Sequence, residues 1–246
     1  MHPAIYQPPP PDWALAVDEL HVWRVPTGPA ERELEELAEV LHPEEIARAG
    51  RYHFEVDRRR SIVSRGWLRR LLAGYLGCAP KSLEFVVGPQ GKLSLDRAAG
   101  ELEFNVSHSH ELVLYAVACG SEVGIDVEHV RPLQDLRAVA RRNFTPSENK
   151  LLTQSELAPA RQLEEFFRLW TRKEAVIKGV GTGLATPLAA FDVSSHGGVP
   201  ESWQRVEIPP PDTSSWLVTE LAIDSGYQAA LATARQPRTI RYWTIA

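Results

Sequence analysis

The sequence contains few cysteines and no long apolar segment. Only Cys78 and Cys119 occur among 246 residues, which excludes a disulfide framework but leaves one isolated pair open. Two thiols without C-x-x-C spacing are typical of a reducing compartment, so the sequence predicts a cytoplasmic protein. No apolar run approaches the roughly 18 residues that a membrane span requires, and the proline-rich start at 8–11 has no signal-peptide core. We therefore expect no membrane partner.

Basic residues are fewer than acidic residues, and lysine is rare. The formal net charge is −5, which excludes the global basic field of a nucleic-acid-binding protein and leaves only local basic patches. The chain has 22 arginines and only 5 lysines, and two of the lysines, Lys173 and Lys178, lie within one short segment.

The sequence does contain a pattern of strands and helices that occurs twice. Helical spacing is found near 34–41, 57–76, 133–140, 146–152 and 161–178, and Pro43 followed by two glutamates opens a further short helix. Strand patterns are found near 20–25, 83–87, 92–95, 103–107, 112–118, 123–127, 191, 203–208, 216–223, 227–234 and 239–244. We predict an α+β fold of two similar, pseudo-twofold-related halves, 1–119 and 120–246, with a site at their interface.

The strand predicted at 123–127 carries two carboxylates. Asp126 and Glu128 are two residues apart and therefore point the same way, whereas Ile125 and Val127 point to the opposite face. Adjacent like charges destabilise a strand, and a divalent cation would reverse that effect. Oxygen ligands favour Mg²⁺ or Mn²⁺ over zinc. The alternative is a solvated edge strand.

The helix predicted at 161–178 offers a third carboxylate. Trp170, Glu174 and Lys178 follow one another at intervals of four residues and share one face. The alternative is an exposed Glu–Lys pair, but the neighbouring tryptophan argues against full exposure. Three glycines at 179–183 either let the backbone approach a ligand or form a flexible helix exit, and they do not form a Walker loop.

Polar residues at 105–110 end another predicted strand. Ser107 and His108 are adjacent and point to opposite faces, so they do not fit a nucleophile and its base, and no G-x-S-x-G elbow occurs. Anion contact and turn chemistry remain open alternatives. At 57–61, clustered arginines followed by Ser61 suit phosphate oxygens, although a solvated cationic helix end has the same pattern.

These motifs together resemble one family. N-V-S-H-S at 105–109, G-I-D-V-E at 124–128 and W-T-R-K-E-A-V-I-K at 170–178 match, in order and spacing, the Sfp-type 4′-phosphopantetheinyl transferases. The resemblance carries motifs over about 43–191 and holds only in outline elsewhere. It implies two α+β halves with coenzyme A between them, Mg²⁺ dependence with Mn²⁺ as a possible substitute, and transfer of phosphopantetheine to a serine of an apo acyl or peptidyl carrier protein. The products would be the holo carrier and 3′,5′-ADP.

The resemblance also implies roles for individual residues. Asp126, Glu128 and Glu174 would hold the metal. Lys178 would contact the pyrophosphate and assist the leaving group, and Glu174 is the candidate base for the carrier serine, although we rank its metal role first. Together with His108, three of these residues form the implied catalytic set: Glu174, Lys178 and Asp126.

Further residues match the family's coenzyme A contacts. Ser107 and His108 would contact phosphate, with His108 near the 3′-phosphate. The remaining implied contacts are Arg48, Arg60, Ser61 and Lys92. Leu93 replaces the proline of the family's G-K-P element, and Glu45 stands where some members carry a lysine, so the contact expected there is in doubt. Glu148 matches a glutamate of the helix after the acidic strand.

Two other functions use the same residues. A metal-dependent phosphohydrolase would direct water at a coenzyme A-like pyrophosphate, and a non-catalytic coenzyme A-binding protein would have lost the carboxylates. The intact acidic residues disfavour the second, and the absence of another acidic or histidine cluster disfavours the first. We expect a monomer acting in fatty-acid, polyketide or nonribosomal peptide biosynthesis. Arg137, Arg141 and Arg142 form a candidate dock for an acidic carrier.

Overall fold

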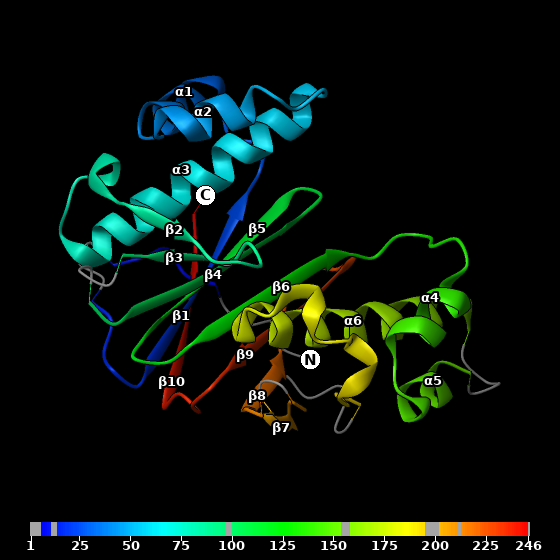
Figure 1. Ribbon diagram of the computed structural model, residues 1–246. Coiled ribbons are helices and arrows are strands. Elements are labelled where there is room, and N and C mark those ends of the chain that lie inside the picture. Colours follow the sequence, from blue (N-terminus) through cyan, green and yellow to red (C-terminus); the bar gives the residue numbers. More distant parts are fainter. Residues whose placement is uncertain are drawn as a thin grey trace.

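The computed structural model describes residues 6–10, 14–96, 100–153, 158–194, 202–210 and 213–245, and it has the predicted α+β composition (Figure 1). The first part of the chain forms β1 (Glu19–Pro26), α1 (Glu31–Glu39), α2 (Pro43–Ala49), α3 (Glu55–Leu76), β2 (Phe85–Val87), β3 (Leu93–Leu95), β4 (Leu102–Ser109) and β5 (Leu112–Cys119). The second part forms β6 (Val123–His129), α4 (Leu136–Asn143), α5 (Pro146–Thr153), α6 (Pro159–Val180), β7 (Gln204–Glu207), β8 (Ser215–Glu220), β9 (Tyr227–Thr233) and β10 (Thr239–Thr244).

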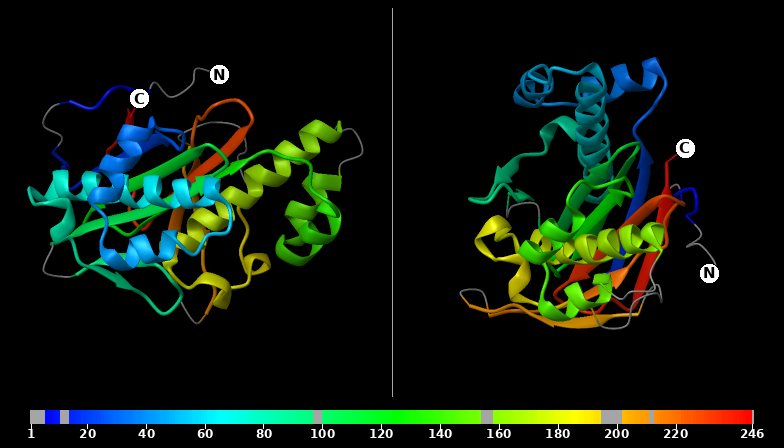
Figure 2. Two further views of the ribbon diagram at one scale, coloured as in Figure 1. Left: turned by 90° about the horizontal axis from the view of Figure 1, so that it is seen from above. Right: turned by 90° about the vertical axis from the view of Figure 1, so that its right-hand side faces the viewer.

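Two four-stranded sheets form the centre of the molecule. Their strand orders are β10-β1-β5-β4 and β6-β9-β8-β7, and β2 and β3 make a separate hairpin. Helix α3 lies over the first sheet, α1 and α2 pack against α3, and α6 lies along β6 and β9 of the second sheet (Figure 1, Figure 2). Strand β10 pairs in parallel with β1 and so joins the first sheet from the end of the chain. The division at 119 and 120, and a pseudo-twofold relation between the halves, stay predictions.

Apolar side chains fill three cores, because the central strands are apolar on both faces. In β5, Tyr115 belongs to the core beneath α3, whereas Leu114 and Ala116 belong to the core between the two sheets. In β6, Ile125 packs into the core between the sheets, and the neighbouring Asp126 points to the opposite side. The alternation read from the sequence is therefore confirmed, and it delivers the acidic side chains to the face that carries α6.

Local chemistry sets the helix ends near the site. Helix α2 begins with a capping box, in which the His42 side chain accepts from Glu44 N–H and Glu45 accepts from His42 N–H. Helices α3 and α6 both end at a glycine in the left-handed region, Gly77 with φ 62° and Gly181 with φ 79°. None of the described helices is both long and apolar enough to cross a membrane.

Strands β4 and β6 are edge strands of different sheets, and side chains rather than a backbone ladder join them. From Asn105 onward, alternate side chains of β4 accept a hydrogen bond from an N–H of β6: Asn105 from Ile125 at 3.0 Å, Ser107 from Val127 at 3.3 Å and Ser109 from His129 at 3.0 Å. We call this row of side chains the β4–β6 seam. It satisfies the exposed N–H groups of an edge strand and fixes the two sheets in one register.

The strand predicted at Phe191 is wrong, and the structure shows where the proline-rich start lies. No strand forms at Phe191, because Leu188–Ala190 make a 3-10 turn and the Phe191 carbonyl accepts from Lys173 Nζ at 2.6 Å. At the outer edge of the first sheet, Gln7 N–H donates to the Tyr242 carbonyl at 3.1 Å. The prolines at 8–10 follow directly and lack an N–H, so they cannot extend this pairing.

Candidate functional site

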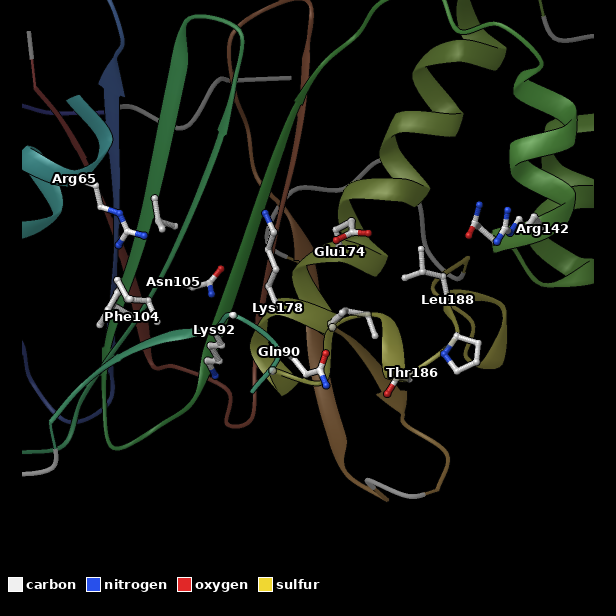
Figure 3. Close-up of a pocket in the computed structure, with 18 residues that line it drawn as sticks. Arg65, Gln90, Lys92, Phe104, Asn105, Arg142, Glu174, Lys178, Thr186 and Leu188 are labelled. Atoms are coloured by element: carbon white, nitrogen blue, oxygen red, sulfur yellow. The ribbon is translucent and has the colours of Figure 1, made fainter. Parts of the chain in front are cut away.

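A cavity of about 610 Å³ lies between the two parts of the molecule. Its walls come from the β2–β3 turn, β4, α4, the end of α6 and the turn at 186–188. Lys92 and Asn105 line it from the first part, and Glu174 and Lys178 line it from α6 (Figure 3). The expected interfacial site is therefore present as a cavity with charged groups on its walls.

Three carboxylates gather beside this cavity, but they are not equally exposed. Asp126 is only 3% exposed, Glu174 is half-buried, and Glu128 lies at the more open end of β6. Burial raises the pKa of Asp126 and that of Glu174, and each carboxyl's pKa is raised further by the negative charges beside it. The carboxylates thus crowd negative charge into a poorly hydrated place, which a cation would stabilise.

Lys178 supplies part of that compensation. Its ammonium donates to Asp126 Oδ1 at 2.6 Å and to Ser107 Oγ at 2.8 Å. The Ser107 hydroxyl in turn donates to the same Asp126 oxygen at 2.8 Å. The other carboxylate oxygen, Asp126 Oδ2, is buried and has no hydrogen-bond partner among the described residues. An orphaned anionic oxygen of this kind is costly unless a cation or a proton meets it.

The donor set therefore fits a hard divalent cation. All three carboxylates offer oxygen, which Mg²⁺ and Mn²⁺ prefer, and the orphaned oxygen of Asp126 is available for a metal–ligand bond. Among the described residues, however, no three Asp, Glu, His or Cys side chains are already arranged as a metal cage. An ion would have to draw Glu128 and Glu174 toward Asp126 through side-chain rotation.

The anion contacts expected from the sequence are dispersed. Lys92 lines the cavity, but its ammonium donates to the Gly179 carbonyl at 2.6 Å. His108 is exposed at the other face of β4, where desolvation by its surroundings and the charges of Lys178 and Arg60 lower its pKa. Its imidazole is therefore neutral near pH 7.

Three residues expected at the coenzyme A site lie away from the cavity walls. Arg60 pairs with Asp57 at 3.3 Å on the first turns of α3, and Ser61 follows it on the same helix. Arg48 lines a separate hollow of about 390 Å³ with Arg51 and Tyr52. A ligand that touched all of the predicted residues would therefore have to extend from the cavity along α3 toward α2.

Two residues on the cavity wall were missed by the sequence analysis. The Arg65 guanidinium makes no hydrogen bond or ion pair in the part of the chain that the structure describes, and burial lowers its pKa. Asn105 Oδ1 is held by Ile125 N–H, which leaves its amide NH₂ for the cavity. The signal for Arg65 was present: Ser61, Arg65 and Arg69 recur every four residues and share one face of α3.

Two acidic residues singled out in the sequence are used for structure. Glu45 accepts from Arg69 Nε at 2.6 Å and so ties α2 to α3, which explains why no lysine stands there. Glu148 pairs with Lys173 at 2.9 Å, and both side chains are completely buried. Lys173 also donates to the Leu188 carbonyl at 2.7 Å. This pair secures the turn that forms one wall of the cavity.

Comparison with known proteins identifies a family for this chain. The model of the 4′-phosphopantetheinyl transferase superfamily matches residues 122–233, and that of the 4′-phosphopantetheinyl transferase N-terminal domain matches residues 25–120. The 4′-phosphopantetheinyl transferase HetI of Nostoc sp. is 38% identical over 238 residues, 96% of each chain. Psf-1 of Bacillus pumilus, another such transferase, is 32% identical over 84% of each chain. Sfp of Bacillus subtilis is 26% identical over 83% of this chain and 87% of its own.

Proposed function

Because the chain belongs to the 4′-phosphopantetheinyl transferase superfamily, we propose that it transfers 4′-phosphopantetheine from coenzyme A to a serine of an apo acyl or peptidyl carrier protein, with Mg²⁺. The observation that carries the proposal is a cavity between the two parts of the molecule that Glu174 and Lys178 line, with the Lys178 ammonium bonded to the buried Asp126. Two acids and an ammonium around a cavity suit a reaction on a pyrophosphate.

The reaction breaks the phosphoanhydride bond of the coenzyme A pyrophosphate and forms a phosphoester bond to the carrier serine. The carrier serine oxygen attacks the phosphorus that bears pantetheine, the P–O bond to 3′,5′-ADP breaks, and the serine proton leaves to a base. Asp126, Glu128 and Glu174 would hold Mg²⁺, which supplies electrophilic activation of the phosphoryl group when bound. Lys178 would donate to the pyrophosphate and stabilise charge on the departing oxygen.

Glu174 is the candidate proton acceptor. Burial and the charge of Asp126 raise the pKa of its carboxyl, which makes it a better base than an exposed glutamate. A residue that ligates a metal tightly is a poorer free base, so its metal role ranks first. In either role the negative charge of Glu174 is required, and an amide at this position should stop the transfer.

Cations on the cavity wall fit the phosphates of coenzyme A. The Arg65 guanidinium, which no described residue pairs, is available for a phosphate from the first part, and Lys92 is available once it releases the Gly179 carbonyl. An incoming phosphate would favour protonation of His108, because the protonated ring donates from both nitrogens whereas the neutral ring donates from only one.

The carrier would dock beside the cavity mouth on α4 and α5. A groove of about 380 Å³ there contains apolar Leu136 and Pro146 together with the basic Arg137, Arg141 and Lys150. Arg142, on the same helix, lines the catalytic cavity. A basic and apolar groove at this point suits an acidic amphipathic helix. Charge reversal at Arg137 and Arg141 should raise the KM for the carrier and leave the KM for coenzyme A unchanged.

Two broader expectations have indirect support. Cys78 and Cys119 are free thiols, as in a reducing cytoplasm. Both sides of the cavity come from one chain, so a monomer would contain a whole site. The order of elements and the face-to-face packing of the two sheets agree with a site assembled within one molecule.

The test is intact-mass spectrometry of apo acyl and apo peptidyl carrier proteins incubated with this protein, coenzyme A and Mg²⁺. We expect a mass gain of one phosphopantetheine that is abolished by EDTA. Hydrolysis of coenzyme A without a gain on either carrier would instead identify a phosphohydrolase. Coenzyme A binding with neither reaction would identify a binding protein.

A further inference from the structure

Ser109, at the end of β4, contacts the acidic strand in two ways at once. Its hydroxyl oxygen accepts from His129 N–H at 3.0 Å, and the same oxygen lies 2.9 Å from Glu128 Oε2. An amide N–H only donates and a carboxylate only accepts, so the serine proton must point to Glu128. The hydroxyl rotor is therefore fixed by its two partners.

The same arrangement occurs one repeat earlier along the β4–β6 seam. Ser107 accepts from Val127 N–H at 3.3 Å and donates to Asp126 Oδ1 at 2.8 Å. Each serine thus links a backbone N–H of β6 to the carboxylate that precedes it. β4 and β6 have no backbone ladder between them. The two hydroxyls therefore fix both the orientation of the carboxylates and the register of β4 against β6.

We propose that Ser109 is a positioning residue for Glu128, orienting that carboxylate for a divalent cation. This inference rests on the proposed metal site, and it gives a role to Ser109, which has none in the proposed function. Glu128 lies at the open end of β6, where a glutamate side chain is mobile unless a neighbour restrains it. The donated hydrogen bond engages Oε2 and restricts the carboxylate, as an outer partner does for a metal ligand.

A rival partner of Glu128 is weaker. Arg131 Nη1 lies 3.2 Å from the same oxygen, but the arginine side chain is 53% exposed and its ion pair is screened by solvent. Arg131 is only three residues from Glu128 in the sequence, so this ion pair does not fix Glu128 relative to β4. Removing Arg131 should leave cation affinity unchanged or raise it, because a competing positive charge is lost.

The experiment measures Mn²⁺ binding by titration with and without saturating coenzyme A, with free Mn²⁺ followed by electron paramagnetic resonance. Ser109→Ala and the nearly isosteric Ser109→Cys should weaken binding about tenfold, because alanine has no donor and a thiol is a poor one. Ser109→Thr keeps the hydroxyl and should bind within about twofold of the unaltered protein. Ser94→Ala, on the exposed β2–β3 hairpin, is the matched control.

Circular dichroism establishes that each variant is folded at the temperature of the titration. Should Ser109→Ala fail to fold, the comparison of the cysteine and threonine variants carries the test. Folded Ala and Cys variants that bind Mn²⁺ as tightly as the unaltered chain would overturn the role of Ser109. Absence of Mn²⁺ binding by the unaltered protein would overturn the metal site itself, so the two failures are distinguishable.

Discussion

Gly124 brings the acidic strand into direct contact with α6. A Cβ added at this position would lie 2.0 Å from the Ala175 carbonyl oxygen and 2.4 Å from Gly179 N, both backbone atoms of α6. Neither atom can swing aside as the end of a side chain would. We therefore expect Gly124→Ala to force β6 and α6 apart, and with them Asp126 and Glu174.

The size of the effect follows from these contacts. A tolerable carbon–oxygen contact needs the two elements to separate by about 1 Å, and overpacking of this kind costs about 3 kcal/mol. In a chain of this length that lowers the Tm by about 6 to 12 °C. A displacement of about 1 Å between catalytic groups also lowers kcat by about 100-fold.

The assay combines urea unfolding with the rate of carrier modification. Gly28→Ala is the matched control, because a Cβ there meets nothing within 4 Å, and it should change the free energy of unfolding by less than about 0.5 kcal/mol. If Gly124→Ala matched the control in stability and kcat, the close approach of β6 to α6 would be refuted.

Three further predictions follow. Burial lowers the pKa of His21 to about 4, so the unfolded chain binds the proton more readily than the folded chain. The free energy of unfolding should therefore fall by up to about 3 kcal/mol as the pH drops from about 6.5 to about 4. In urea unfolding at several pH values, His21→Gln should flatten this dependence on pH. Lys173→Met and Glu148→Gln should each cost about 3 kcal/mol in denaturant titrations, since each leaves a buried group uncompensated. Arg65→Ala should weaken coenzyme A binding about tenfold by calorimetry without lowering the Tm.

Each of these has an outcome that contradicts it. A His21→Gln variant that keeps the full pH slope between about pH 6.5 and about pH 4 would contradict the assignment of that slope to His21. The buried pair is misjudged if the cost of changing Lys173 and Glu148 together equals the sum of the single costs, because contacting partners should not be additive. A drop in Tm for Arg65→Ala, with coenzyme A affinity unchanged, would make that guanidinium structural.

The features of the fold that depend on the residues of a single strand or helix were predictable from the sequence. The alternation of β4 and β6 placed Asn105 and Ser107 on one face, and Asp126 and Glu128 on another, before any contact was known. The pairing of β10 with β1 was not predictable, since a strand's sequence records its apolar faces and not its neighbours. Phe191 was assigned to a strand because short apolar segments do not distinguish a strand from a buried turn.

Within the site, local motifs identified the acidic residues and α6, but not the groups that restrain them. The partner of Glu148 is 25 residues away along the chain, and only the packed structure pairs it with Lys173 rather than with a ligand. Arg65 belongs to a polar repeat of α3, but the sequence does not record that this part of the helix faces the cavity. Ser109 belonged to a recognised motif, yet its contact with Glu128 depends on how two sheets abut, which no short-range pattern encodes.

The central claim is that Glu174 acts with Asp126 at the cavity as a charged group for phosphopantetheine transfer. The most direct measurement compares the transfer rate of Glu174→Gln with that of Glu164→Gln, which changes an exposed glutamate of the same helix. The account predicts a loss of at least about 1,000-fold for Glu174→Gln, with an unchanged Tm and a normal rate for the control. Transfer by Glu174→Gln at the rate of the control would contradict it.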